Sequence, residues 1–402
     1  MLIERIMQEM ANIKQAGLAR EIKDLQYLDA VTAQDRKGKQ YLVFSSNNYL
    51  GLTFAPEVRQ AAATAALQQG TGSTGSRLTT GGVCAATILE KELAQFKHAE
   101  AALIFNTGYM TNLGVLFALA KSTDVIFSDE LNHASIIDGC RISKARVIIY
   151  KHGDSKDLEQ KLQQWEQEEQ EKNTAVAACR FIVSDGVFSM DGDIAPLPDL
   201  VKLKQQYAAT LIIDDAHSVG VLGNDGSGTA AYYHLEGQVD LQVGTLSKSL
   251  AAEGGYVAGK KMIIDYLRNK SRPFIFSTFL SPADMEAALA ALRILKTEAP
   301  AYLRRLRENT DYVRSALTAA GLPVVPGMTP IIPVITGSAS LAVKLEQRLY
   351  QEGILLSAIR PPTVAPGSSR LRITITAAHT RTQLQRLIVL LSKAWQDLVQ
   401  HE

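Results

Sequence analysis

The sequence predicts an α/β fold in which helices cover both faces of a mostly parallel sheet, followed by a smaller α+β domain. From about residue 101, short apolar runs alternate with segments of helical period, and these runs are ALIFN, DVIFSD, RVIIY, RFIVSD and TLIIDD. Because the runs lack polar alternation, they indicate strands buried on both faces, as in parallel sheets. Beyond about residue 281 the pattern changes to a long helical stretch and strand candidates separated by prolines, which indicates a second domain.

The elements follow in order along the chain. The opening MLIERIMQEM has spaced apolar residues, which predict an amphipathic helix instead of a signal peptide. A short run, YLVFSS, a helical segment from Pro56 and a Gly-, Ser- and Thr-rich loop (70–82) come next, and the runs VDLQVG and GYVAG come late in the large domain. The last part has the long helix ADMEAALAALRILKTEA, the strand candidates PVVPG, IIPVI, ILLSAI and LRITIT, and a final helix from Thr380.

These patterns divide the chain into three parts. We expect an N-terminal helix and arm (1–45), a large domain (46–281) and a small C-terminal domain (282–402). The chain of 402 residues is long enough for two domains that each have a core.

Composition narrows the class of protein. Lysine and arginine number 42 against 41 acidic residues, so the balance indicates neither a nucleic-acid nor a membrane partner. The 3 cysteines form no C-x-x-C pair, which argues against a disulfide framework and a thiolate metal site, and we expect no metal. No run approaches the roughly 20 apolar residues that cross a bilayer, and we expect a cytoplasmic protein.

Lys248 is the first candidate for chemistry. It lies in GTLSKSL among the small residues Thr245, Ser247 and Ser249, and AAEGG follows. An exposed loop lysine is the commoner case when one residue is taken alone. However, a lysine forms a Schiff base only when its amine is neutral, and burial beside small polar groups favours that state.

Further polar residues follow the other strand candidates, where α/β domains bind ligands. Asp214 ends a buried strand, and such a carboxylate needs a cation, for which the protonated pyridine nitrogen of pyridoxal phosphate (PLP) is suited. A capping or core aspartate is the alternative, and the adjacent Asp215 shows that acidity alone is not diagnostic. His217 could donate to the phenolate oxygen of the cofactor, and His133 could stack on its ring.

A phosphate site is also indicated. Gly108 and Tyr109 follow the run LIFNT and open a helix, where backbone N–H groups and the helix dipole attract anions, although an ordinary strand-to-helix turn has the same pattern. Thr245 lies three residues before Lys248, so its hydroxyl could hold the phosphate while the amine meets the aldehyde carbon.

One motif points elsewhere and is rejected. Gly70, Gly72 and Gly75 match G-x-G-x-x-G, but a helical segment precedes them where a dinucleotide site needs a strand. An NAD-dependent oxidoreductase is therefore the weakest alternative.

With these residues collected, the chain resembles the α-oxoamine synthases, which are PLP enzymes of fold type I. The resemblance runs nearly end to end through SSNNYLGL, GTGSTGSRLTTGG, FNTGYMTNLG, DELNHASIIDG, SDGVFSMDGD, DDAHSVGVLG, GTLSKSLAAEGGYVAG, FIFSTFLSP and AIRPPTVAPGSSRLRITIT. It implies a PLP-dependent transferase fold type I with a seven-stranded sheet, PLP as cofactor, and a homodimer with active sites at the subunit interface.

The resemblance also implies roles for individual residues. Lys248 holds the cofactor and moves protons at the amino-acid Cα, Asp214 pairs with the pyridine nitrogen, and His217 and His133 contact the ring. The implied cofactor-binding residues are Gly108, Tyr109, His133, Ser189, Asp214, Asp215, Ala216, His217, Thr245, Leu246, Ser247, Lys248, and, toward the neighbouring subunit, Ser277 and Thr278. The implied substrate contacts are Arg20, Asn47, His133, Arg360, Thr363 and Arg370, with Arg370 chosen for the amino-acid carboxylate.

The segment IRPPTV, from Ile359, is most similar to the branch of the family that joins alanine to a pimeloyl thioester in biotin synthesis, with release of carbon dioxide. The donor thioester is coenzyme A or a carrier protein. A branch that joins glycine to acetyl-CoA is the nearest alternative, and a non-catalytic binding protein with the same fold is an alternative of another class.

Overall fold

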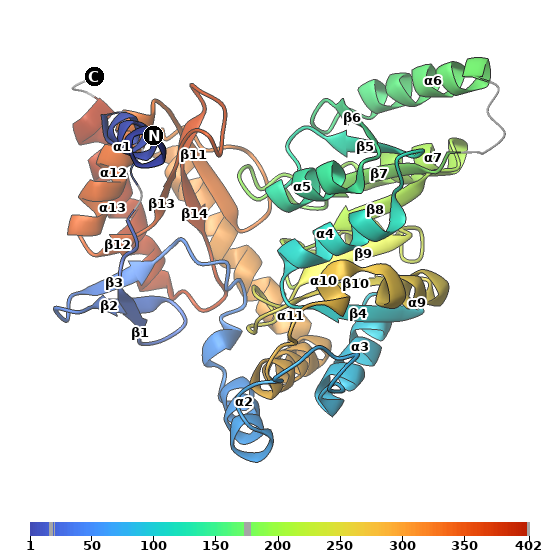
Figure 1. The fold of residues 1–402 in the computed structure, drawn as a ribbon. Helices are drawn as coiled ribbons and strands as arrows, with labels where there is room; N and C mark the ends of the chain where they lie inside the picture. The colour runs from blue at the N-terminus through green and yellow to red at the C-terminus, as the bar shows by residue number, and fades with distance from the viewer. Residues whose placement is uncertain (16–18, 20, 173–177, 400–402) are drawn as a thin grey trace.

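The computed structural model describes residues 1–15, 19, 21–172 and 178–399 (Figure 1). Figure 1 shows two bodies side by side, with the long helix α11 (Pro282–Ala319) running between them. One body is built on a large sheet, and the other contains the N-terminal and C-terminal strands. The chain crosses between the bodies more than once, since strands near its N-terminus pair with β12 (Ile354–Leu355) in the second body. The predicted domain boundaries remain predictions.

The large sheet has a single antiparallel strand among its described members, so it is mostly parallel, as the sequence predicted. Its seven strands lie in the spatial order β4 (Ala101–Phe105), β10 (Gly255–Gly259), β9 (Leu241–Thr245), β8 (Thr210–Asp214), β7 (Arg180–Asp185), β5 (Val125–Asp129) and β6 (Arg146–Tyr150). Only β10 runs against its neighbours, β4 and β9. The remaining neighbouring pairs are parallel.

Helices cover both faces of this sheet, because successive strand residues point to opposite sides and both sides are apolar. Ile126 and Val243 pack on one helical layer, whereas Phe127 and Ile213 pack on the other. The first layer contains α4 (Gly108–Leu119), α5 (Ala134–Ser143), α9 (Lys261–Lys270) and α10 (Arg272–Ile275). The second contains α6 (Ser155–Lys172), α7 (Leu197–Gln206) and the short α8 (Thr229–Tyr232).

The helix α11 joins the two bodies through one continuous apolar core. It is capped by Ser281, whose hydroxyl accepts a hydrogen bond from the Asp284 amide, and it has proline at its first position, a favoured start. Its buried face packs on α2 (Pro56–Gln69) and α3 (Cys84–Phe96) and also on strands of the second body. A short 3₁₀ helix, η1 (Leu52–Phe54), precedes α2.

The second body has two small sheets in the described residues. One is antiparallel, in the order β11 (Ile331–Gly337), β14 (Ser369–Thr374) and β13 (Ser357–Ile359). The other has the order β1 (Leu25–Tyr27), β2 (Thr32–Asp35), β3 (Gln40–Val43) and β12 (Ile354–Leu355). The helices α12 (Ala339–Gln351) and α13 (Arg381–Val399) pack with them. The N-terminal arm therefore shares a sheet with a strand near the C-terminus.

Two strand predictions in this body differ from the structure. ILLSAI was predicted as one strand, but it divides into β12, which pairs with β3, and β13, which pairs with β14. The partners lie in different sheets, so the chain bends at Leu356 between them. PVVPG forms only an isolated bridge from Val324 to Val334.

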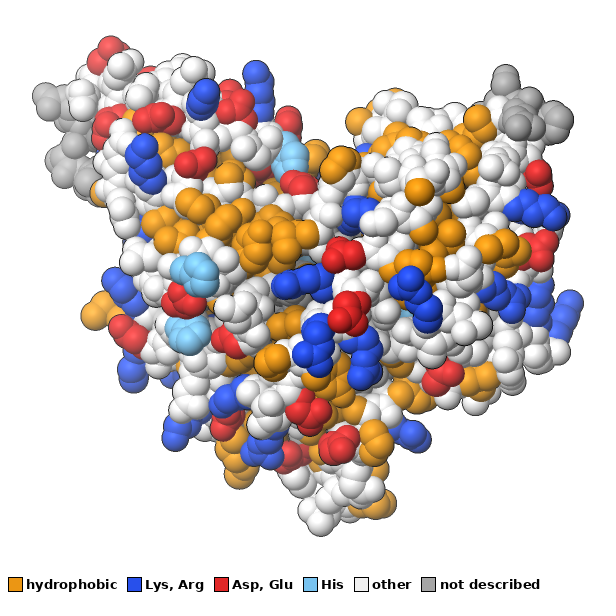
Figure 2. Space-filling model, turned by 180° about the vertical axis from the view of Figure 1, so that it is seen from behind, with side chains coloured by type: hydrophobic (Ala, Val, Ile, Leu, Met, Phe, Trp, Pro, Cys, Tyr) orange, Lys and Arg blue, Asp and Glu red, His pale blue; other side chains and the backbone are white. Residues whose placement is uncertain are grey.

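The N-terminal helix α1 (Leu2–Gln15) forms as predicted, and none of its residues is buried. No helix in the described residues has the length and apolar character needed to cross a membrane. Figure 2 shows lysine, arginine, aspartate and glutamate side chains interspersed on the face opposite to that of Figure 1, in keeping with a formal net charge of +1.

Candidate active site

A cavity of about 130 Å³ lies at the carboxyl ends of the parallel strands. Its lining residues come from the segments after β4, β5, β7, β8 and β9, which all end at this edge of the sheet. The lining residues are Gly108, Tyr109, His133, Ser135, Asp185, Asp214, Ala216, His217, Thr245 and Lys248. The structure thus brings together the core of the predicted constellation from distant parts of the sequence.

Lys248 follows β9 in this cavity. Burial lowers the pKa of its amine from the ordinary 10.5 to about 8, against the opposing effect of the Asp214 and Asp185 charges. A substantial fraction of the amine is therefore neutral near physiological pH, and a neutral amine can attack a carbonyl carbon.

Asp214 ends β8 with a buried carboxylate that is 5% exposed. Its Oδ2 accepts a hydrogen bond of 2.6 Å from Asn112 Nδ2, and its Oδ1 accepts one of 2.9 Å from the Ala216 amide. Asn112 lies on α4 and also donates to Ser135 Oγ at 2.9 Å. These contacts fix a carboxylate at the cavity wall, where a cationic ring nitrogen could pair with it.

His217 is held in the cavity by a contact with Tyr49. The Tyr49 hydroxyl lies 2.6 Å from Nδ1 of His217, and burial raises the pKa of Tyr49 to about 12, so the hydroxyl keeps its proton. Burial, with the charge of Lys248 next, lowers the pKa of His217 well below its ordinary value, so the ring is neutral. When Tyr49 donates to Nδ1, Nε2 of His217 carries the proton of the neutral ring and is a donor.

His133 is the N-cap residue of α5. Its Nδ1 accepts from the Ser135 amide at 3.2 Å and lies 2.8 Å from Ser135 Oγ, while its own amide donates to Asp185 Oδ2 at 2.7 Å. Burial lowers the pKa of the ring, which is in edge contact with Tyr109 at 6.3 Å between centroids. The ring is thus locked in place at the cavity, as stacking on a planar ligand requires.

The start of α4 forms another wall. Gly108 begins this helix, and a Cβ atom there would lie 3.3 Å from the Cβ of Thr245, so the backbone N-terminus comes close to β9. Thr245 Oγ1 donates to the Gly254 carbonyl at 2.9 Å and accepts from the Ser247 amide at 3.1 Å. Free amides at a helix start suit a phosphate group.

Asp215 was predicted at the cofactor site, but its side chain does not line the cavity. The carboxylate points away from the cavity and pairs with Lys97 Nζ at 2.7 Å and with Thr229 Oγ1 at 2.5 Å. The Lys97 and Asp215 side chains are 0% and 1% exposed, respectively. A buried carboxylate needs such a cation, and neighbouring residues at a strand end face opposite ways. Leu246 likewise points into the apolar core.

Arg370 was chosen for the amino-acid carboxylate, but the structure gives it another partner. Its guanidinium forms an ion pair with Asp191 and contacts the Met190 carbonyl at 3.4 Å. Arg372, two residues further along β14, lies on the same face and its Nη2 donates to Asn47 Oδ1 at 3.1 Å. The positive charge of Arg372 also contributes to the lowered pKa of His217, which places this cation near the site.

The other predicted residues that the structure describes do not line the cavity. Ser189 presents its carbonyl to Arg372 Nε at 2.5 Å, and Ser277 and Thr278 lie in the loop before α11. Arg360 donates to the Ala19 carbonyl at 3.0 Å, and Thr363 is in an exposed loop. Arg20 lies outside the described residues.

Sequence reasoning missed four residues that shape the site, namely Tyr49, Asn112, Ser135 and Arg372. A signal existed for two of them. Arg372 alternates with Arg370 in the strand LRITIT, and Tyr49 lies in the quoted segment SSNNYLGL. Asn112 and Ser135 gave no such signal, because their roles depend on how α4 and α5 pack against β8.

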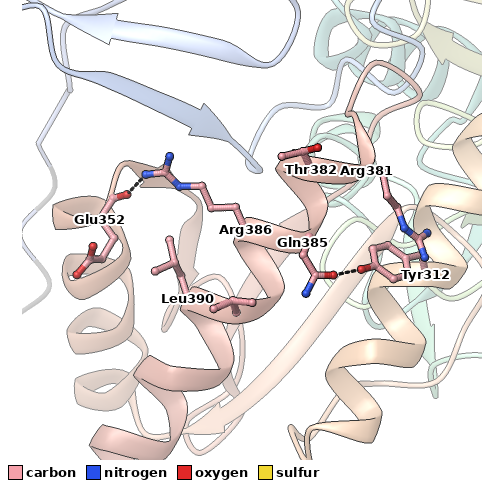
Figure 3. Close-up of a pocket in the computed structure, with 8 residues that line it drawn as sticks. Tyr312, Glu352, Arg381, Thr382, Gln385, Arg386 and Leu390 are labelled. Carbon is pink, nitrogen blue, oxygen red and sulfur yellow. Dashed lines mark hydrogen bonds between the residues drawn. The ribbon is translucent and has the colours of Figure 1, made fainter.

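A larger hollow of about 760 Å³ lies on the outside of α13 (Figure 3). Its polar groups already have partners: Arg386 Nη2 donates to the Glu352 carbonyl at 2.9 Å, and Gln385 bonds the Tyr312 hydroxyl. Arg381 covers the Tyr312 ring. None of the predicted catalytic residues lines it, so we assign the chemistry to the smaller cavity.

Comparison with known proteins agrees with this geometry. Residues 39–391 match the family model for aminotransferases of class I and II. The 8-amino-7-oxononanoate synthase of Lysinibacillus sphaericus is 46% identical over 395 residues, which cover 98% of this chain and 99% of that protein.

Solved structures of related enzymes share the fold of this chain. A serine palmitoyltransferase from S. paucimobilis with a bound PLP–myriocin aldimine superimposes with a TM-score of 0.89 at 30% identity, covering 98% of this chain and 97% of that chain. The 8-amino-7-oxononanoate synthase of Francisella tularensis matches with a TM-score of 0.72 at 29% identity, covering 89% of this chain and 98% of that chain. The chain therefore belongs to the aminotransferase class I and II family and, within it, to the group of the 8-amino-7-oxononanoate synthases.

Proposed function

We propose that this protein is a PLP-dependent acyltransferase that makes 8-amino-7-oxononanoate from L-alanine and a pimeloyl thioester in biotin synthesis. The observation that carries the proposal is full-length similarity to proteins of that name at 46% identity, combined with a lysine of lowered pKa in the cavity. The thiol carrier is coenzyme A or a carrier protein.

The residues at the cavity fit PLP. Lys248 offers an amine to the aldehyde carbon, Asp214 offers a carboxylate to the pyridine N–H, and the start of α4 offers amides to the phosphate. His217 Nε2 is a donor for the phenolate oxygen, and the His133 ring lies where it can pack on the pyridine face. When bound, PLP supplies an electron sink for the carbanion at the amino-acid Cα.

In the proposed reaction, a C–C bond forms between the alanine Cα and the acyl carbonyl carbon, and the C–S bond of the thioester breaks. The bond from the alanine Cα to its carboxylate then breaks, and carbon dioxide leaves. Lys248 removes the Cα proton before acylation and returns a proton to the same carbon after decarboxylation, because its pKa of about 8 suits a base near neutral pH.

We assign the alanine carboxylate to Arg372 in place of Arg370. Arg372 donates N–H groups to Ser189 O, Thr374 Oγ1 and Asn47 Oδ1, and its side chain also interacts with the Tyr49 hydroxyl. None of these partners is an acid, and within the described residues no carboxylate forms an ion pair with Arg372. The charge of Arg370 is offset by Asp191.

The function is tested by turnover. With PLP, L-alanine and pimeloyl-CoA, we expect the protein to release one carbon dioxide for each coenzyme A thiol set free. Mass spectrometry should detect 8-amino-7-oxononanoate as the product. Lys248→Ala is the matched control and should release neither product. Turnover confined to glycine and acetyl-CoA would assign the protein to the sister reaction, and no turnover with either pair would contradict the proposal.

The lowered pKa of Lys248 predicts a pH dependence. Only the neutral amine captures an aldehyde, so the rate at which the apo-protein captures PLP covalently, trapped by borohydride, should rise with pH and reach half its maximum near pH 8. Peptide mapping identifies the modified lysine, and Lys248→Ala should show no capture at that site. A midpoint near the ordinary lysine value would contradict the assignment.

The arginine assignment predicts unequal effects of two matched variants. Arg372→Gln should lower kcat/KM for alanine about 10- to 100-fold, mostly through KM, because it removes charge-assisted hydrogen bonds to the substrate. Arg370→Gln should have a clearly smaller effect. Steady-state kinetics at saturating pimeloyl-CoA distinguishes the two, and the reverse order would restore Arg370 as the carboxylate ligand.

We also propose a homodimer in which Ser277 and Thr278 approach the phosphate site of the neighbouring subunit. These residues lie in the loop between α10 and α11, and Thr278 is exposed, with Phe276 beside it 70% exposed. Sedimentation equilibrium should give about twice the chain mass of 43.7 kDa. A monomer that turns over at the full rate would exclude a shared site.

A further inference from the structure

His152 lies between two carboxylates, Asp129 at the end of β5 and Asp193 in the segment after β7. It follows β6, and its Nδ1 is 3.0 Å from Asp129 Oδ1 while its Nε2 is 2.9 Å from Asp193 Oδ2. Burial alone would lower the pKa of His152, but the hydrogen bonds to the two carboxylates raise it to about 10. Both ring nitrogens therefore carry protons at neutral pH, and each donates to one carboxylate.

The first carboxylate, that of Asp129, forms hydrogen bonds at the start of the loop that carries His133. Asp129 is the last residue of β5, and besides His152 it accepts from the Leu131 amide at 2.9 Å and from the Gly153 amide at 2.9 Å. Loop 129–133 ends at His133, whose amide is bonded to Asp185. The position of the His133 ring thus depends on how Asp129 is held.

The second carboxylate, that of Asp193, belongs to a hairpin of residues 187–194. A bridge between Val187 and Ile194 closes this hairpin. The amide of Phe188 donates to the Asp193 carbonyl at 3.0 Å, and the Phe188 ring meets the His152 ring edge-on at 4.3 Å. Asp193 Oδ1 is buried and has no hydrogen-bond partner in the described residues. His152 is therefore the partner that compensates this carboxylate.

The same hairpin contacts the sheet that carries Arg372. The Ser189 carbonyl accepts from Arg372 Nε at 2.5 Å, and the Gly192 carbonyl accepts from Thr329 Oγ1 at 2.6 Å. Asp191 pairs with Arg370 on the same strand. The hairpin is thus bonded to His152 on one side and to the second body on the other.

We propose that His152 is a positioning residue that fixes His133 and Arg372 relative to each other by holding loop 129–133 and hairpin 187–194 together. Neither contact touches the reacting atoms. Without the cation, two carboxylates that share one partner would repel each other, and the hairpin would lose its tie to β5. This inference rests on the proposed reaction, because His133 and Arg372 are assigned there to the ring and the amino-acid carboxylate.

The test uses the full-length protein loaded with PLP. We expect His152→Gln to lower kcat/KM for alanine about tenfold, and to weaken alanine binding by a similar factor when alanine is titrated without thioester and followed by PLP absorbance. Asp193→Asn is the milder second variant and should act in the same direction. The matched control is His98→Gln, because His98 faces Asp225 at 3.7 Å with both side chains about half exposed, and it should change neither value.

The double variant His152→Gln with Asp193→Asn completes the experiment. If the two residues act through one contact, the double variant should lower kcat/KM for alanine by no more than the more severe single variant does. This loss is far smaller than the product of the two single fold-changes. Folded variants with wild-type alanine binding and a lowered thermal midpoint would reduce His152 to a structural role and overturn the inference. Lack of turnover in the wild-type protein would instead overturn the proposed reaction, so the two failures are distinguishable.

Discussion

The site depends on a geometric constraint, the common direction of the strands β5, β7, β8 and β9. Parallel strands deliver their carboxyl ends to one edge, so residues from 133 to 248 meet in one cavity without any local sequence signal that joins them. A strand with the opposite direction would send its following loop to the far edge. The single antiparallel strand, β10, contributes no lining residue, which agrees with this constraint.

Burial at that edge sets the charge state of each group. It lowers the pKa of His217 well below its ordinary value, so that ring is neutral, and it lowers the pKa of Lys248 to about 8, so part of this amine is neutral near physiological pH. The opposite outcome occurs at His152, where two carboxylates outweigh burial. His152 is thus protonated because two acids contact its ring directly, whereas the more deeply buried Lys248 and His217 have lowered pKa values.

Much of the fold and part of the site could be predicted from the sequence. Uninterrupted apolar runs gave the parallel sheet, and the residues after those runs gave Lys248, Asp214, His217 and His133, all of which line one cavity. The sequence could not separate Asp214 from Asp215 or Arg370 from Arg372. The members of each pair are alike in residue type and in neighbouring sequence, and they differ in their partners, because Asp215 pairs with Lys97 and Arg370 pairs with Asp191.

The pairing of β3 with β12 has a consequence for synthesis of the chain. The strand Gln40–Val43 has its partner at Ile354–Leu355, so a growing chain must produce nearly all of its length before that edge is covered. The large sheet, by contrast, has all its strands between residues 101 and 259 and can form earlier. One edge of β3 therefore stays uncovered until residues 354–355 have been made, and the second body is completed only near the end of translation.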